Sequence, residues 1–463
     1  MIPAVGYAGV QHLQYRYGPI AIEPGQNSIE TGTDLPRPSV PGFITRFSPN
    51  LVYADGGGVP RVDVLHLHHG VWVVNGYPTF AAGEEKTIMQ LPQGFGLRYE
   101  PSDAWVLSYM IHNLTQTPAS VYLTYDVDFV PDGSGTALTP VKPLWMDVAG
   151  IKAYPVFDAL KGSGRRYTFP EEAGKAQRDK VGAAATWTAP ADVTLIAASG
   201  HLHPGGLWND IDVERGGASR RIFRSEAKYF EPAGAVSWDV ATTVTKPGWR
   251  VALRAGDRLE LATTYDTRKA SWYESMGISV LFYASGVPGA DPFAQPVDWH
   301  GQLTHGHLPE NDHHGGGPFG FPDARTLPDG ARTAAVAIRG YVYGRGDLSA
   351  SNATGRPPVV RAGRSLTFKN LDATRGMSPR RSAYHTITAC RAPCSRATGI
   401  AYPLADGKVT FDSGELGYGP SGYTPAANRD TWKTPKSLKP GTYTYFCRIH
   451  PFMRGSFRVT SAR

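Results

Sequence analysis

Cysteine is nearly absent from this chain of 463 residues, and the first 389 residues contain none. The three cysteines are Cys390, Cys394 and Cys447. Disulfides therefore cannot hold the protein together, and its stability must come from large hydrophobic cores. No apolar run approaches the roughly 18 residues of a membrane-spanning helix, so we expect no membrane span. Long Ala, Leu, Glu and Lys runs are missing too, which excludes a coiled coil.

Glycine (53) and proline (38) are abundant, and aromatic residues make up 11% of the chain. The glycines and prolines are scattered without a period, which excludes collagen. Between turn residues lie short strand-like runs, namely Val62–Leu67, Val71–Val74, Trp105–Ile111, Val121–Phe129, Val193–Ala198, Leu259–Tyr265, Ile278–Tyr283, Ser365–Phe368 and Thr442–Phe446. This pattern predicts an all-β chain of β-sandwich domains. Turn-rich clusters near residue 140 and at 286–330 predict domains at 1–140, 141–288 and 331–463, with a linker at 289–330.

The charge is divided unevenly along the chain. Residues 331–463 carry 21 basic against 6 acidic residues, whereas the preceding residues carry 26 against 34. Either a basic C-terminal module faces an acidic body or partner, or the two parts are domains with different surfaces. A nucleic-acid partner is not expected, because the basic residues are spread through strand-like segments without a groove-reading motif.

The sharpest local motif is Thr442-Tyr-Thr-Tyr-Phe-Cys447-Arg-Ile-His450-Pro-Phe-Met453. A thiolate, an imidazole and a thioether follow one another at three-residue steps after an alternating strand. With a second imidazole, for which His385 is suitably placed on a distant strand, these are the ligands of a type 1 copper centre. The last 130 residues or so resemble the cupredoxin family, a Greek-key β-sandwich. Multicopper oxidases and copper nitrite reductases place a His ligand directly before the Cys; here Phe446 stands there, which argues against both families.

Cys390 and Cys394 lie shortly after His385. We interpret them as a local disulfide, with a second metal site as the alternative. A disulfide favours an oxidising, extracytoplasmic compartment, periplasmic or secreted. The first residues, Met1 to Gly6, contain neither a basic nor a long apolar segment, so no signal peptide is expected in this sequence.

Histidine and methionine also cluster in the first 290 residues, at His66, His68, His69, His112, His201, His203 and Met276. In each His-X-His element the two imidazoles sit two apart on a predicted strand and project from one face. That arrangement suits metal chelation, and a soft methionine sulfur favours copper over zinc.

Their order resembles the copper type II, ascorbate-dependent monooxygenases, the family of peptidylglycine α-hydroxylating and dopamine β-monooxygenases, over about residues 50–285. The resemblance implies two jelly-roll domains on either side of a solvent-filled cleft, each with one copper. It implies that His68, His69 and His112 hold a His-only relay copper, and that His201, His203 and Met276 hold the oxygen-activating copper. Peptide-amidating members have an Arg where Ser199 stands and a Tyr where Val280 stands, so a peptidylglycine substrate is not expected.

Three further histidines have open roles. His66 either replaces one of the first pair, adds a ligand, or orients a neighbour. His305 and His307 repeat the His-X-His pattern within the linker, which is either an exposed connection or a further copper site.

Together these patterns predict about three copper ions per chain and a monooxygenase that hydroxylates a small organic substrate with O2. Electrons would come from an external donor through the fused type 1 site. Docking of the basic module across subunits would give a homo-oligomer. Two alternatives stay open: an extracytoplasmic copper-binding electron carrier without an organic substrate, and a copper oxidase or reductase of O2 or a nitrogen oxide.

Overall fold

The structure is a computed structural model that describes most of the chain. The described residues are 9–26, 28–62, 64–85, 87–115, 117–152, 154–160, 166–175, 177–229, 240–268, 271–304, 322–349, 356–377, 382–390, 410–418, 428–450 and 452–461. Within them the chain forms strands, with two single-turn 3₁₀ helices, η1 (Arg178–Lys180) and η2 (Ala183–Ala185). The predicted all-β class is confirmed. None of the described helical segments is long and apolar enough to cross a membrane.

The largest sheet has nine strands and runs through the predicted boundary near residue 140. Its order is β1 (Gln11–Ile22), β9 (Ala119–Pro131), β3 (Gly42–Tyr53), β7 (Phe95–Tyr99), β10 (Thr139–Asp147), β21 (Gly277–Ala284), β14 (Val193–Leu202) and β18 (Val251–Leu253), with β6 (Met89–Gln90) beside β3. Strand β10 pairs with β7 on one side and with β21 on the other. One sheet therefore joins the two parts of the body, which we call the first half (residues 9–138) and the second half (139–304).

Each half adds sheets of its own. In the first half, four strands follow the order β2 (Ile29–Gly32), β8 (Trp105–Asn113), β4 (Leu65–Val74) and β5 (Tyr77–Gly83). In the second half, seven strands comprise β12 (Arg166–Phe169), β19 (Arg258–Asp266), β15 (Gly206–Arg215), β16 (Ala218–Tyr229), β17 (Val240–Val244) and β22 (Gln302–Thr304), with β13 (Thr186–Thr188) beside β19. A two-stranded sheet pairs β11 (Phe157–Ala159) with β20 (Trp272–Ser275).

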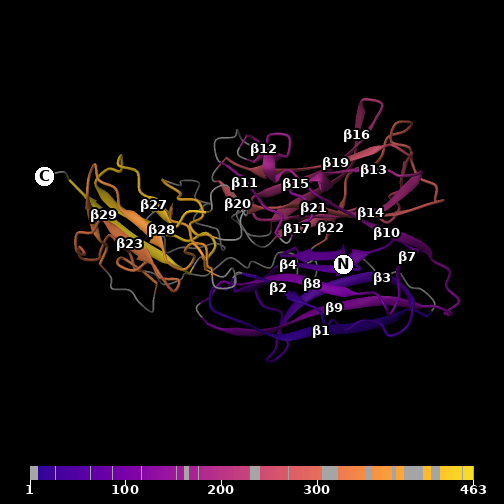
Figure 1. Cartoon of the computed structure of the whole chain (residues 1–463), viewed down its shortest axis with the longest axis horizontal. Coiled ribbons are helices and arrows are strands. Elements are labelled where there is room, and N and C mark those ends of the chain that lie inside the picture. Colours follow the sequence, from indigo (N-terminus) through magenta and orange to yellow (C-terminus); the bar gives the residue numbers. More distant parts are fainter. Residues whose placement is uncertain are drawn as a thin grey trace.

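The C-terminal part is a separate sandwich, seen beside the body in Figure 1. One sheet has β23 (Ala335–Ile338), β25 (Thr367–Asn370) and β27 (Thr431–Lys433); the other has β24 (Val359–Arg361), β29 (Arg454–Thr460), β28 (Gly441–Phe446) and β26 (Thr388–Cys390). Phe368 from the first sheet and Tyr445 from the second pack at 5.1 Å between ring centroids, so both sheets share one core.

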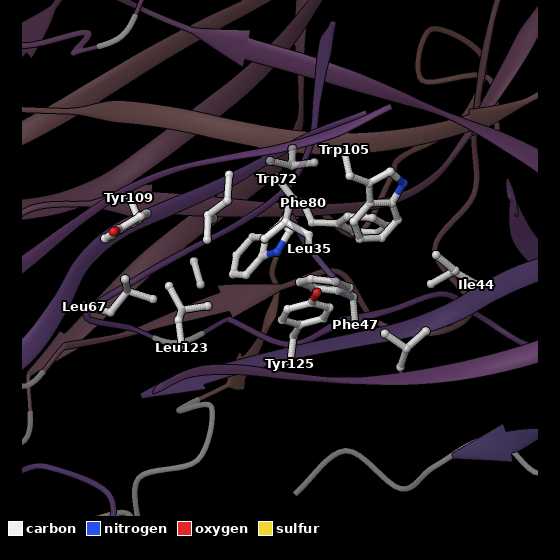
Figure 2. Packing of buried hydrophobic residues seen from close by; sticks show 14 of the residues in the cluster. Leu35, Ile44, Phe47, Leu67, Trp72, Phe80, Trp105, Tyr109, Leu123 and Tyr125 are labelled. Carbon is white, nitrogen blue, oxygen red and sulfur yellow. The ribbon is translucent and has the colours of Figure 1, made fainter. Parts of the chain in front are cut away.

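Aromatic side chains dominate the core of the first half (Figure 2). Phe47 stacks on Phe80 at 4.2 Å and lies 4.9 Å from Trp72, centroid to centroid. Large rings of this kind bury much apolar area and prefer stacked or edge-to-face contacts. Leu67 of β4 and Leu107 of β8 belong to this core, and these two strands carry the histidines described next.

Candidate metal centres

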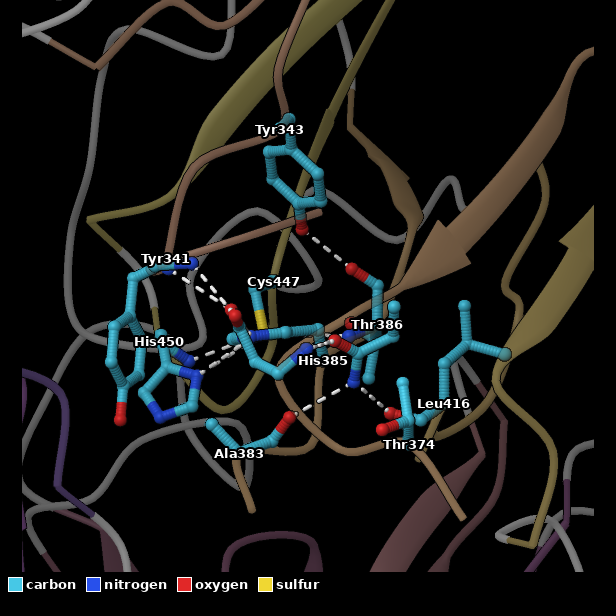
Figure 3. Close-up of polar contacts among 12 residues, drawn as sticks. Tyr341, Tyr343, Thr374, Ala383, His385, Thr386, Leu416, Cys447 and His450 are labelled. Atoms are coloured by element: carbon cyan, nitrogen blue, oxygen red, sulfur yellow. Dashed lines mark hydrogen bonds and ion pairs between the residues drawn. The ribbon is translucent and has the colours of Figure 1, made fainter. Parts of the chain in front are cut away.

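Three potential ligands meet in the C-terminal sandwich (Figure 3). The sulfur of Cys447 lies 3.9 Å from Nδ1 of His385 and 3.7 Å from Nδ1 of His450. The two Nδ1 atoms are 3.3 Å apart. All three side chains are buried. The expected pairing of the distant His385 with the Cys447 loop is therefore present in the structure.

The loop after β28 brings two of these ligands and Met453 together. Cys447 follows the last residue of β28, and its N–H donates to the carbonyl of Met453 at 3.3 Å. The N–H of Met453 donates to the carbonyl of His450 at 2.9 Å, which turns the chain back into β29. Met453 is buried in the same core as Cys447. The three-residue spacing thus corresponds to one tight turn.

Hydrogen bonds orient the side chains of the Cys447 site so that they can bind a cation. Nε2 of His385 lies 3.0 Å from a carboxylate oxygen of Asp372, which leaves Nδ1 to face the sulfur. The backbone N–H groups of Thr386 and His450 both point at the sulfur at 3.4 Å. Burial alone would raise the pKa of the Cys447 thiol, but hydrogen bonds with His385 and His450 outweigh it and hold that pKa well below its usual range. A thiolate with two imidazoles fits a soft transition-metal ion.

In the body, a β-bulge in β4 lies among the histidines of the first half, His66, His68 and His69. His66 on β4 pairs with His112 on β8, and His69 pairs with Met110, so His68 is the extra residue between them. A bulge turns side chains that would otherwise alternate between the faces of a sheet. The rings of His68 and His112 stack at 4.1 Å, and those of His66 and His112 lie 5.0 Å apart.

His201 lies near the end of β14 in the second half, and His203 directly follows that strand. Nδ1 of His203 donates to the carbonyl of Glu274 at 2.6 Å, which fixes Nε2 as the nitrogen able to bind a metal. Nδ1 of His201 lies 3.0 Å from both carboxylate oxygens of Glu85. Among the described residues, neither His201 Nε2 nor His203 Nε2 has a hydrogen-bond partner, although both are buried.

The histidines of the two halves meet in one cluster. The rings of His68 and His203 are 4.2 Å apart, whereas the monooxygenase resemblance implied two sites separated by a cleft. Potential ligand atoms lie within 4.8 Å of one another in two groups, His68–Glu84–His203 and Glu84–Glu85–His201. Sequence reasoning missed Glu84 and Glu85; their only signal was an acidic pair directly after the strand that ends at Gly83.

Burial favours the uncharged forms of four imidazoles and one carboxyl group in the cluster. Burial, followed by repulsion from neighbouring imidazoles, holds the pKa of His68, His112 and His203 well below the usual value. Burial and His201 lower the pKa of His69 to about 3. Burial and Glu85 raise the pKa of Glu84 well above its usual range. Neutral imidazoles are the form that binds metals, and the buried Nε2 atoms of His69, His201 and His203 have no hydrogen-bond partner among the described residues, so the cluster fits a metal ion.

Met276 shares a cavity with two histidines of this cluster, His69 and His201. It is buried and lines a cavity of about 340 Å³ together with His69, His201 and Glu85. The remaining wall is mostly apolar, with Val71, Val73, Pro78, Ala82, Val106, Trp145, Ile278 and Val280. The structure thus brings Met276 and His201 to one chamber that is large enough for a small organic molecule.

The C-terminal sandwich touches the histidine cluster directly. A cavity of about 60 Å³ is lined by His68, His112 and His203 from the body and by Thr386, Arg448 and Ile449 from the sandwich. The guanidinium of Arg448 lies over the rings of Trp272 and Tyr273 at 5.1 and 5.2 Å and binds Asp412 at 3.0 Å. Because Arg448 follows Cys447, the two candidate centres adjoin.

Other predicted residues take different places. Nδ1 of His66 donates to the carbonyl of Val62 at 2.7 Å, and its Nε2 lies 3.9 Å from Glu84, so His66 packs at the edge of the cluster. His305, His307 and Cys394 lie outside the described residues, as does the side chain of Cys390. The disulfide, and the oxidising compartment inferred from it, stay predictions.

No family model and no curated protein matches the sequence. A purple cupredoxin from Nitrosopumilus maritimus is 19% identical over 28% of this chain and 100% of its own, with a TM-score of 0.17. A Cu(I) form of an amicyanin variant is 20% identical over 31% of this chain and 92% of its own, with a TM-score of 0.16. A Cu-containing nitrite reductase from Thermus scotoductus SA-01 is 13% identical over 95% of this chain and 91% of its own, with a TM-score of 0.18. All three TM-scores are low, so these likenesses assign no activity to this chain.

Proposed function

We propose that this protein is a copper-dependent oxidoreductase, a monooxygenase of a small and mainly apolar molecule. Type 1 copper would be held by His385, Cys447, His450 and Met453. The body copper would be held by imidazoles of the histidine cluster, His68, His69, His112, His201 and His203, with Met276 at the substrate chamber. When bound, copper supplies one-electron chemistry and the activation of O2.

The observation that carries this proposal is the junction cavity. His68, His112 and His203 face Arg448 and Ile449 across a space of about 60 Å³. Electrons entering at Cys447 would therefore reach the body through one or two residues. The missing His ligand at Phe446 does not prevent this, because the contact is made on the other side of Cys447. Phe446 itself packs into the core of the second half, which anchors the sandwich on the body.

The chamber beside Met276 supports an organic substrate. Its wall is mostly apolar, while His69, His201 and Glu85 gather at one part of it. An apolar wall would exclude water and hold a C–H bond near the donor cluster. The overall reaction balances as R–H + O2 + 2 e⁻ + 2 H⁺ → R–OH + H2O, with both electrons from an external one-electron donor.

A second candidate is an oxidase or reductase without an organic substrate. The junction cavity favours it, because about 60 Å³ suits a molecule of a few heavy atoms, such as O2 or a nitrogen oxide. In that case the larger chamber would not be used in turnover.

Isotope labelling separates the candidates. Copper-loaded full-length protein is given ascorbate, either ¹⁸O2 or nitrite, and a panel of small aromatic and aliphatic compounds. A hydroxylated product with one ¹⁸O for each O2 consumed supports the monooxygenase. Consumption of O2 or nitrite that no organic compound alters would establish the second candidate instead, and reversible reduction without turnover would leave an electron carrier.

A further inference from the structure

We propose that the body holds two copper ions that share the carboxylate of Glu84, at the contact between the two halves. One ion would be bound by His68, His203 and Glu84, and the other by His201, Glu85 and Glu84. This inference rests on the proposed copper chemistry of the body and adds to it a carboxylate-bridged pair in place of two separate ions.

The two ligand groups overlap in a single residue. In each group the potential ligand atoms lie within 4.8 Å of one another, and Glu84 belongs to both. One oxygen of Glu84 lies 3.5 Å from Nε2 of His68, which is too long for a hydrogen bond but suits two ligands of a common cation. A carboxylate has two oxygens and can therefore serve two ions at once.

Several ligand atoms of Glu84, His201 and His203 have no hydrogen-bond partner among the described residues. Neither oxygen of Glu84 accepts a hydrogen bond among the described residues, although the side chain is fully buried. The same holds for His201 Nε2 and His203 Nε2. Unsatisfied buried polar atoms are rare, and several in one place call for a bound group. Cations bound at Glu84 would supply partners for its two oxygens and for Nε2 of His203.

The absence of a side chain at Gly83 makes room for this arrangement of His201 and Glu85. A Cβ at Gly83 would lie 2.4 Å from the ring of His201 and 2.7 Å from a carboxylate oxygen of Glu85. Only glycine therefore allows His201 to approach the acidic pair from the other half. The N–H of Gly83 also donates to Glu85 at 3.1 Å, which orients that carboxylate toward His201.

The test is copper reconstitution of the full chain with Glu84→Gln. Metal-free protein is titrated with Cu(II), desalted, and measured by metal analysis and electron paramagnetic resonance. Wild type should bind about three ions per chain and show a half-field transition from the close pair. Glu84→Gln should lose that transition, either by losing one ion or by binding two that no longer interact.

Two variants complete the test. Glu274→Gln removes another buried carboxylate near the cluster, one bonded to Tyr154 at 3.0 Å, and should keep both body ions and the transition. If Glu84→Gln does not fold, His203→Gln should lose one body ion and the transition while its type 1 absorption persists.

The outcomes separate this inference from the proposed function. If the wild type binds three ions that do not interact, or if Glu84→Gln keeps the full half-field transition, Glu84 does not bridge two ions. Either result would leave the proposed copper enzyme unaffected. Wild type that binds only the type 1 ion would instead overturn the proposed function.

Discussion

The imidazoles of His68 and His203 pack edge to face with 4.2 Å between ring centroids, although they belong to different halves of the body. His68 is the extra residue of a bulge in β4, and His203 follows the end of β14. Their contact makes the relative position of the two halves part of the site. Any metal bound between them would also join the halves, and its binding energy would add to the stability of the body.

Cys447→Ser should remove the intense thiolate-to-copper absorption band and about one copper ion per chain, because a hydroxyl does not replace a thiolate as a soft ligand. Visible absorption and metal analysis of the reconstituted protein measure both effects. The matched variant Cys390→Ser should keep the band. Persistence of the band in Cys447→Ser would refute the type 1 assignment.

Asp372→Asn should weaken copper binding at the C-terminal site by about 10–100-fold, because Asp372 orients His385 through Nε2. Competition with a copper chelator, followed through the absorption band, gives the affinity. Asp430→Asn, which alters an acidic residue on the sandwich outside the site, is the control. Equal affinities in the two variants would show that Asp372 does not position His385.

Met276→Leu should lower turnover by at least about tenfold while the type 1 band is unchanged, because leucine keeps the volume and removes the sulfur beside the chamber. Oxygen consumption with ascorbate measures turnover. Met89→Leu makes the same exchange at a methionine of another cavity and should turn over normally. Full activity of Met276→Leu would remove Met276 from the proposed site.

Arg448→Gln should slow electron transfer from the type 1 site to the body by about tenfold, because Arg448 joins Cys447 to the junction cavity and packs on Trp272 and Tyr273. Stopped-flow measurement follows the return of the type 1 band after its rapid reduction. The exposed Lys439→Gln is the control. A rate equal to that of the control would place the electron path elsewhere.

The metal-free protein should lose stability as the pH falls from 7.5 to 5.0. The pKa of His69 is about 3 in the folded chain because of burial and His201, but about 6.5 in an unfolded chain. Below pH 6.5 the unfolded chain gains a proton that the folded chain does not, so the free energy of unfolding falls. His69 alone should account for about 2 kcal/mol of this loss. Urea unfolding measures this, and the fall in the free energy of unfolding between pH 7.5 and 5.0 should be about 2 kcal/mol smaller in His69→Gln than in the wild type. An equal fall in both proteins would contradict the claim that His69 is buried and neutral.

The sequence by itself was sufficient for the all-β class and for naming the C-terminal residues that the structure brings together, His385, Cys447 and His450. Alternating strands and turn residues are local signals, and Cys447, His450 and Met453 come from one tight turn, so their spacing already carries the geometry. His385 was found because the type 1 ligand set requires a second imidazole. Asp372 was not anticipated, because an outer hydrogen-bond partner has no fixed spacing from the ligand that it orients.

The sequence also identified the histidines of the body, but only the tertiary structure decided how they are grouped. The bulge at His68, the sheet that continues through β10, and the close approach at Gly83 are long-range features without a local period. They place Glu84 and Glu85 among imidazoles from both halves. Residue types and spacing thus determined which potential metal ligands are available. Packing between distant strands determined which of these ligands lie together, because contacts across a sheet depend on register and not on proximity along the chain.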